Sequence, residues 1–134
     1  MNTIKIVSTP DAPVAVGPYS QAIVVNGFIF CSGQIGTDPK TGNLADRIEN
    51  QIKQVLNNLK AVLKASGSDL NQVVKTTVYL KNMADYAVFN QIYGEYFKEN
   101  KPARATIEVA RLPKDCLIEI DAIAVVSSMT KKEL

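Results

Sequence analysis

One stretch decides the fold: the segment KPARATIEVARLPKDCLIEIDAIAVV, from Lys101 to Val126. It contains two runs typical of β-strands, residues 104–109 and 117–126, joined through a proline that suits the second position of a tight turn. Side chains along a strand alternate between its two faces. If the aliphatic residues of both runs pack on the core, Arg104 and Glu119 both lie on the opposite face of the sheet. A cation and a carboxylate on one exposed face predict either a polar site or an interface.

The two charged side chains are far apart if this stretch forms a simple hairpin. Pairing around Pro113 places Arg104 opposite about Ala124, and Glu119 about five residues along the ladder, on the order of 15 Å away. The two side chains then cannot contact one small ligand within a single hairpin. Either the two strands are not neighbours or the site is composite across subunits, and we expect a composite site.

The rest of the chain alternates strand and helix patterns. Asn26-Gly27 between two β-rich runs is typical of a type I′ hairpin, because both central residues need positive φ. Apolar residues keep helical spacing over residues 46–66, with Gly67 as a fitting stop, and again from residue 82 or 85 to about residue 98. The expected strands are residues 3–7, 21–25, 28–32, 73–80, 104–109 and 117–126.

This order of elements favours an α+β fold in one domain, residues 1–134. Two helices cannot cover both faces of a six-stranded sheet, so we expect a single-layer mixed sheet with both helices on one face. The uncovered face then carries apolar side chains such as Leu117 and Ile123 beside the charged ones. A partly apolar exposed face predicts burial against another subunit.

Composition excludes several classes of protein. The chain has 46% hydrophobic and 21% charged residues, as ordinary globular domains do, and a net charge of +2 that predicts no nucleic-acid surface. It has no histidine, which removes a Ser-His-Asp triad, a histidine base and most zinc sites. Cys31 and Cys116 match no metal or redox spacing, so we expect two buried thiols. No metal and no cofactor are predicted.

The two ends of the chain predict a cytoplasmic protein. The first residues, MNTIKIVSTPDAP, contain no long apolar segment, so we expect neither a secretory signal nor a membrane span. Residues 131–134, KKEL, loosely resemble a retention tail, but without a signal segment we expect a frayed, charged end.

Short motifs occur in a specific order along the chain: Gly17-Pro18-Tyr19-Ser20-Gln21-Ala22, then Ser32-Gly33-Gln34, then Pro102-Ala103-Arg104 with Ile107, Arg111-Leu112 and Ile118-Glu119-Ile120. Together they resemble the Rid/YjgF family, and the resemblance covers nearly the whole chain. Members of that family are reactive-intermediate deaminases, which hydrolyse 2-imino acids such as 2-iminobutanoate and 2-iminopropanoate. The resemblance implies a chorismate-mutase-like subunit fold and a homotrimer.

The resemblance also implies which residues form the site. Arg104 stands at the carboxylate-binding position of the members that have the activity, and the other implied lining positions are Tyr19, Ser32, Gly33, Asn90 and Thr106. Some members have cysteine where this chain has Thr106. We therefore expect no thiol-dependent behaviour at that position.

The chemistry of Arg104 and Glu119 suits an imino acid substrate. Arginine binds a carboxylate through two parallel hydrogen bonds, and a glutamate near a bound electrophile holds or deprotonates a water. From the residues alone, an interface ion pair is the simpler interpretation, whereas the resemblance favours catalysis. A ligand-binding or regulatory homotrimer without catalysis is the alternative, since the same arginine would serve it. RNA cleavage finds no support, because the chain has no histidine pair and no basic stripe with aromatic residues.

Overall fold

Strand β6 (Ile118–Val125) lies inside the sheet, paired with β3 (Phe28–Gln34) on one side and β4 (Val73–Leu80) on the other, in a computed structural model that describes residues 3–128. The full strand order is β1-β2-β3-β6-β4-β5, where β1 is Lys5–Val7, β2 is Ala22–Val25 and β5 is Ala103–Glu108. Only the β4–β5 pair is parallel. The expected six-stranded mixed sheet is therefore confirmed.

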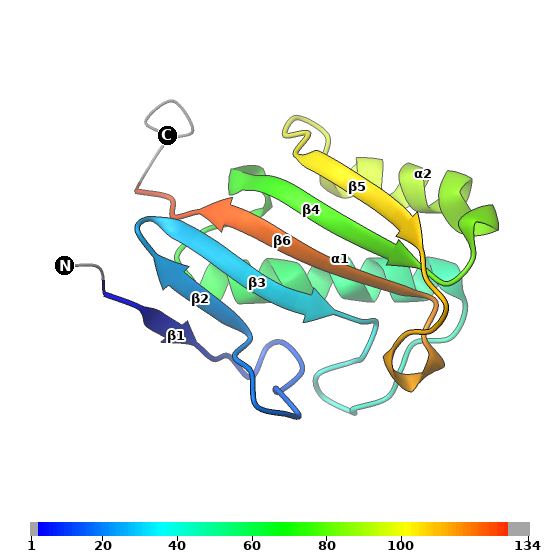
Figure 1. Cartoon of the computed structure of the whole chain (residues 1–134), viewed down its shortest axis with the longest axis horizontal. Coiled ribbons are helices and arrows are strands. Elements are labelled where there is room, and N and C mark those ends of the chain that lie inside the picture. The colour runs from blue at the N-terminus through cyan, green and yellow to red at the C-terminus, as the bar shows by residue number, and fades with distance from the viewer. Residues whose placement is uncertain (1–2, 129–134) are drawn as a thin grey trace.

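Two helices cover one face of this sheet, α1 (Ile48–Ala65) and α2 (Tyr86–Tyr96), and both lie behind the strands in Figure 1. Apolar residues of α1 such as Ile52, Val55 and Leu59 are almost completely buried against the inner face of β6 and β3, as the helical spacing requires. Short 3₁₀ turns occur at Leu70–Gln72 (η1), Met83–Asp85 (η2) and Pro113–Asp115 (η3). The other face of the sheet carries no helix within residues 3–128.

Several local expectations are confirmed. Asn26 and Gly27 have φ of 54° and 78°, as a type I′ turn requires, and they join β2 to β3. Gly67, with φ of 84°, follows the end of α1 and lets the amides of residues 66–68 return to carbonyls of its last turn. Cys31 and Cys116 are buried, free thiols.

The last two strands do not form a simple hairpin, so the first of the two alternatives left open by the sequence holds. Strand β4 lies between β5 and β6, so the two strands are not neighbours. Because α2 connects β4 to β5, the chain returns to the sheet in the same direction and β5 pairs in parallel at the edge. The turn at Pro113–Asp115 then carries the chain back past β4, with Lys114 and Asp115 at φ of 56° and 52°, and β6 enters on the other side of β4.

The expectation that Arg104 and Glu119 share a face is wrong. Arg104 is in register with Thr76, which is fully buried under the helices, so its side chain points to the helix face. Glu119 is in register with Tyr79 and points to the open face, as expected. The error comes from β5 being an edge strand: its aliphatic residue Ile107 is 45% exposed on the open face, and its polar residues face α2.

Two further expectations concern the ends and the membrane. Residues 131–134, expected as a charged end, lie outside the described residues. Within residues 3–128, no helix is long and apolar enough to cross a membrane.

Candidate active site

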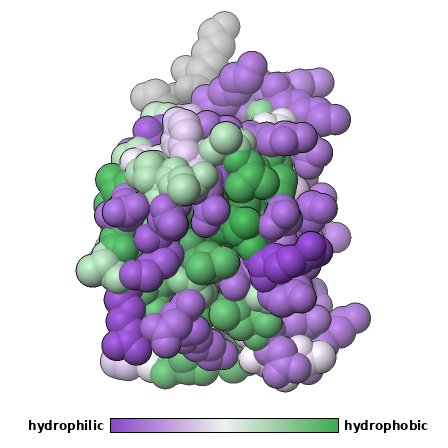
Figure 2. Space-filling model, turned by 90° about the vertical axis from the view of Figure 1, so that its right-hand side faces the viewer, coloured by the Kyte–Doolittle hydropathy of each residue, from purple (hydrophilic) through white to green (hydrophobic). Residues whose placement is uncertain are grey.

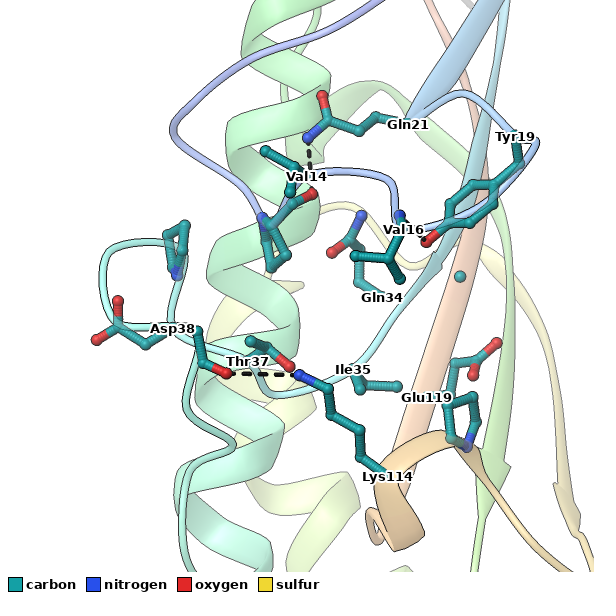
Figure 3. Close-up of a pocket in the computed structure, with 15 residues that line it drawn as sticks. Val14, Val16, Tyr19, Gln21, Gln34, Ile35, Thr37, Asp38, Lys114 and Glu119 are labelled. Atoms are coloured by element: carbon teal, nitrogen blue, oxygen red, sulfur yellow. Dashed lines mark hydrogen bonds between the residues drawn. The ribbon is translucent and has the colours of Figure 1, made fainter.

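Five of the predicted site residues line two separate hollows. The first, which we call the Glu119 pocket, has a volume of about 310 Å³ and is walled by three segments, residues 13–21, 33–42 and 113–119. Figure 3 shows the side chains of Val16, Ile35, Lys114 and Glu119 around its common space. Tyr19 and Gly33 also line this pocket. Most of its wall is apolar, so Glu119 is a carboxylate in a largely apolar setting.

Gly33 is required where it stands because the Glu119 side chain lies directly over it. A Cβ built at Gly33 would lie 2.9 Å from the Glu119 Cδ and 3.2 Å from its Cγ, and closer still to Oε2. The ladder between β3 and β6 shifts register between Cys31 and Gln34, next to this contact. The missing side chain of Gly33 therefore makes room for the Glu119 side chain.

Glu119 is half-buried, and its environment disfavours the charged form. Burial raises the pKa of Glu119 above its usual range, and the nearby negative charge of Asp121 raises it further. A carboxyl group with a raised pKa is a stronger base when ionised and accepts a proton closer to neutral pH. This is what a group that takes a proton from water needs.

The upper wall of the pocket is a proline-rich loop held by one buried side chain. Gln21, only 4% exposed, accepts from the Thr9 amide through Oε1 and donates through Nε2 to the carbonyls of Thr9 and Pro13. The loop ends at Tyr19, whose exposed phenol oxygen accepts from the Val16 amide at 3.4 Å. Figure 3 shows the hydrogen bonds of Gln21 to the Pro13 carbonyl and of the Val16 amide to Tyr19.

The opposite wall is held by two amides on helix α1. Asn58, 1% exposed, donates to the carbonyls of Ile35 and Thr37, and Gln51 donates to the carbonyl of Ala45 while accepting from the Leu117 amide. Both side chains lie within the buried stripe of α1. They fix the wall of the pocket and the start of β6, two residues before Glu119.

Ser32 is placed beside the pocket, but its hydroxyl is already used. Its Oγ donates to the carbonyl of Ser20, and its amide donates to the carbonyl of Gln21. In this structure Ser32 joins β3 to the segment that carries Tyr19. It offers its free hydrogen-bonding capacity only as an acceptor.

The second hollow, which we call the Arg104 hollow, lies on the helix side of β5. Its volume is about 410 Å³, and it is lined by residues of the C-terminal half of α2, the following loop and Arg104. The Arg104 Cζ lies 5.7, 5.1 and 5.0 Å from the ring centroids of Tyr86, Phe89 and Tyr93. Three aromatic rings therefore surround one guanidinium, and cation–π attraction stabilises it there.

The other two expected residues of this side lie close to Arg104. Asn90 lines the same hollow and hydrogen-bonds the phenol of Tyr86. Thr106 follows Arg104 on the same face of β5, and its Oγ1 is buried without a hydrogen-bond partner among the described residues. A buried hydroxyl without a partner is costly, and Thr37 Oγ1 and Gln72 Oε1 share this condition among the described residues.

One chain does not bring the two hollows together. Through β4, Arg104 is aligned with Ala122, so Glu119 lies two strands across and three residues along, about 10 Å in each direction. The two side chains also point to opposite faces of the sheet. The structure unites Tyr19, Gly33 and Glu119 in one hollow and Asn90 and Arg104 in the other, while Thr106 lies two residues from Arg104 on the same face of β5.

Comparison with known proteins decides the family. A family model described as endoribonuclease L-PSP matches residues 9–126. A solved Rid family protein from Yersinia pestis is 46% identical, with a TM-score of 0.91 over 92% of this chain and 100% of that one. The chain belongs to the Rid/YjgF family.

Two further members of the Rid/YjgF family have names that refer to small molecules. The human 2-iminobutanoate/2-iminopropanoate deaminase is 47% identical over 131 residues, covering 97% of this chain and 96% of that protein. Escherichia coli TdcF, solved with bound serine, is 40% identical with a TM-score of 0.89, covering 92% of this chain and 99% of that one. The fold and the family predicted from the sequence are therefore confirmed.

Sequence reasoning missed the residues that hold the site together. Gln21, Gln51 and Asn58 are polar residues at buried positions, and a pattern of apolar spacing passes over them. On the apolar side of α2, Phe89 and Tyr93 are buried core residues, as the helical spacing predicts. They also lie under Arg104, which the sequence alone does not indicate.

Proposed function

We propose that this protein hydrolyses reactive 2-imino acids, such as 2-iminobutanoate and 2-iminopropanoate, to 2-keto acids and ammonia. The observation that carries the proposal is the pair of unmatched charges. Within residues 3–128, no carboxylate forms an ion pair with the caged Arg104, and no cation forms one with Glu119 in its pocket. The similarity to the human deaminase supports the same reaction.

The proposal includes a homotrimer in which Arg104 of one subunit meets Glu119 of the next. Support comes from the separation of the two hollows within one chain and from exposed apolar side chains on the uncovered sheet face, Ile6, Phe30 and Ile107 among them. Figure 2 views a different surface, the end of the molecule at the right of Figure 1, and hydrophobic residues are exposed there among hydrophilic ones. Exposed apolar regions of this kind are commonly buried between subunits.

In this mechanism Arg104 captures the substrate. The guanidinium donates two parallel hydrogen bonds to the carboxylate of the imino acid, and the surrounding rings hold the guanidinium in place. Asn90 and Thr106 lie beside it to contact the rest of the substrate. Serine bound to TdcF is likewise a ligand with a carboxylate beside a nitrogen-bearing carbon.

Glu119 performs the proton transfers. Its ionised carboxylate takes a proton from a water, and the water oxygen forms a bond to the imine carbon while the C=N electron pair moves to nitrogen. The imine nitrogen enters protonated, as C=NH2+, so the tetrahedral intermediate carries one hydroxyl and one amino group. Glu119 returns its proton to that nitrogen, which makes it a neutral ammonia leaving group. As the C–N bond breaks and the C=O bond forms, Glu119 accepts the hydroxyl proton and passes it to the ammonia, so the 2-keto acid and ammonium leave and Glu119 is again ionised.

The decisive assay generates the imine in place. A threonine or serine dehydratase produces 2-iminobutanoate or 2-iminopropanoate, and the appearance of the 2-keto acid is followed with and without this protein. We expect a clear acceleration. Equal rates with and without the protein would reject hydrolysis and leave a ligand-binding trimer, since the same arginine would serve it.

Assembly is tested separately by light scattering. We expect a mass of three times the 14.6 kDa of one chain. A monomeric mass at micromolar concentration would reject the composite site, because one chain keeps Arg104 and Glu119 on opposite faces of its sheet.

A further inference from the structure

Tyr86 stands at the centre of the Arg104 side, and neither the sequence motifs nor the comparisons single it out. It is the first residue of α2 and is 40% exposed. Its phenol oxygen lies 3.1 Å from the Arg104 Nη2 and also hydrogen-bonds the side chain of Asn90. One hydroxyl therefore joins a residue of β5 to a residue of α2, and both are expected to contact substrate.

The direction of these contacts follows from donor chemistry. A guanidinium has five N–H donors and no acceptor, so Arg104 donates and the phenol oxygen accepts. The hydrogen bond from Asn90 and the positive charge of Arg104 lower the pKa of Tyr86. The phenol therefore uses up one N–H of Arg104 and fixes the guanidinium's rotation, which leaves its other N–H groups for a carboxylate.

The position of Tyr86 is itself well fixed. The 3₁₀ turn before it is capped by Asn82, whose side chain accepts from the Ala84 amide at 2.9 Å. The same turn is tied to the end of β5, because Glu108 Oε1 accepts from the Met83 amide at 2.8 Å. The Tyr86 ring is thus held against β5, and its centroid lies 5.7 Å from the Arg104 Cζ.

We propose that Tyr86 is a positioning residue: its phenol holds the Arg104 guanidinium and the Asn90 amide in the orientation that receives the substrate's carboxylate. This rests on the proposed function of Arg104 as the carboxylate anchor. Orienting a long, flexible arginine before binding lowers the entropy lost on binding, so the effect belongs to substrate affinity. It leaves the proton transfers by Glu119 unchanged.

The test is Tyr86→Phe, which keeps the ring and removes only the hydroxyl. We expect the Kd for 2-ketobutanoate, a stable product analogue, and the KM for 2-iminobutanoate each to rise about fivefold, the worth of one hydrogen bond, with kcat within about twofold. The matched control is Tyr96→Phe on the same helix, whose phenol hydrogen-bonds Asn57, and it should change none of the three.

A second readout uses pH and separates positioning from a merely structural contact. As pH rises through the lowered pKa of Tyr86, the phenolate forms and pairs with Arg104, so 2-ketobutanoate should bind more weakly to the wild type. Tyr86→Phe should lack this loss. The variant keeps every other titratable group near the site, so the difference between the two pH profiles reports on the phenol alone. These groups are Arg104, Lys101, Tyr93, Asp85 and Glu108.

The outcomes distinguish the two proposals. Unchanged Kd and KM in Tyr86→Phe, superimposable pH profiles, or a loss of kcat without a change in Kd would each overturn the role of Tyr86 while the deaminase stands. If the wild type binds 2-ketobutanoate but accelerates no imine hydrolysis, the deaminase fails and the binding measurements still decide on Tyr86. A wild type that binds no 2-keto acid would overturn Tyr86 as well.

Discussion

The Glu119 pocket and the Arg104 hollow are built in opposite ways. The walls of the Glu119 pocket are irregular loops, held by single buried amides at Gln21, Gln51 and Asn58. The Arg104 hollow is built from a strand and a helix in regular register, with aromatic rings as its packing. In the proposed reaction, the side that activates water is thus formed by shaped loops around one carboxylate, and the side that binds the carboxylate of the substrate by one cation held in place by rings.

The largest expected effect is the loss of kcat on substitution of Glu119. Glu119→Gln nearly preserves shape and removes the basic oxygen, so kcat for 2-iminobutanoate should fall by ~10²- to 10⁴-fold, the usual worth of a general base. Binding of 2-ketobutanoate should stay within about twofold, because the anchor is intact. Calorimetry and the dehydratase-coupled assay measure the two quantities. A large loss of binding would show that Glu119 serves mainly as an interface residue.

A substitution of Arg104 should lower activity less than Glu119→Gln, and mainly by raising KM. Arg104→Lys keeps the charge but loses the planar fork, so kcat/KM should fall by ~10- to 100-fold, the worth of one charge-assisted hydrogen bond, mostly through KM. The variant must remain oligomeric by light scattering. If instead it dissociates while activity per intact oligomer is unchanged, Arg104 is an interface residue.

The contact between Gly33 and Glu119 tests whether the position of the carboxylate in the Glu119 pocket matters for kcat. Gly33→Ala introduces a methyl group against the Glu119 side chain and displaces its carboxylate, so kcat should fall ~10-fold. The control is the same change in a Glu119→Gln background, where the well-placed carboxylate is already lost. There Gly33→Ala should cost little further activity. Equal losses in both backgrounds would contradict the proposed role of this contact.

How much of this the sequence predicted depended on the region. Strand β4 was predicted with both its ends, and the helix ending before Gly67 and the Asn26-Gly27 turn were predicted from local patterns. These features depend on neighbours in sequence, which is why a single sequence suffices. The family resemblance supplied the remaining candidate residues.

The rest could not be predicted because it depends on pairing at a distance. Alternation assigns the residues of β5 to two faces but does not say which face meets the helices, and at an edge strand burial gives a weak signal. The insertion of β4 between β5 and β6 follows from the crossover through α2, which no local motif encodes. Buried amides such as Asn58 are recognisable only once the carbonyls that they bind are placed.

The smallest expected effect is a shift in the pH dependence of kcat/KM when the charge of Arg104 is removed. Within one chain, burial and Asp121 raise the pKa of Glu119, so kcat/KM should fall as pH drops through that raised value and the base is protonated. In the proposed trimer, Arg104 of the neighbouring subunit lies close to Glu119 and its positive charge opposes this shift. Arg104→Gln should therefore move the acid limb up by ~0.5–1 pH unit, and Arg104→Lys should leave it in place. If the acid limb lies at the same pH in the wild type and in both Arg104 variants, Arg104 is not close to Glu119 in the assembled protein.

Mixing two inactive variants tests the central claim most directly. Arg104→Ala supplies an intact Glu119, and Glu119→Gln supplies an intact Arg104. If each site joins the two residues across subunits, trimers reassembled from equal amounts of the two variants should recover roughly a quarter of wild-type activity, because about one interface in four pairs both intact residues. Activity no higher than the sum of the separate variants, in trimers shown to be mixed, would contradict the composite site.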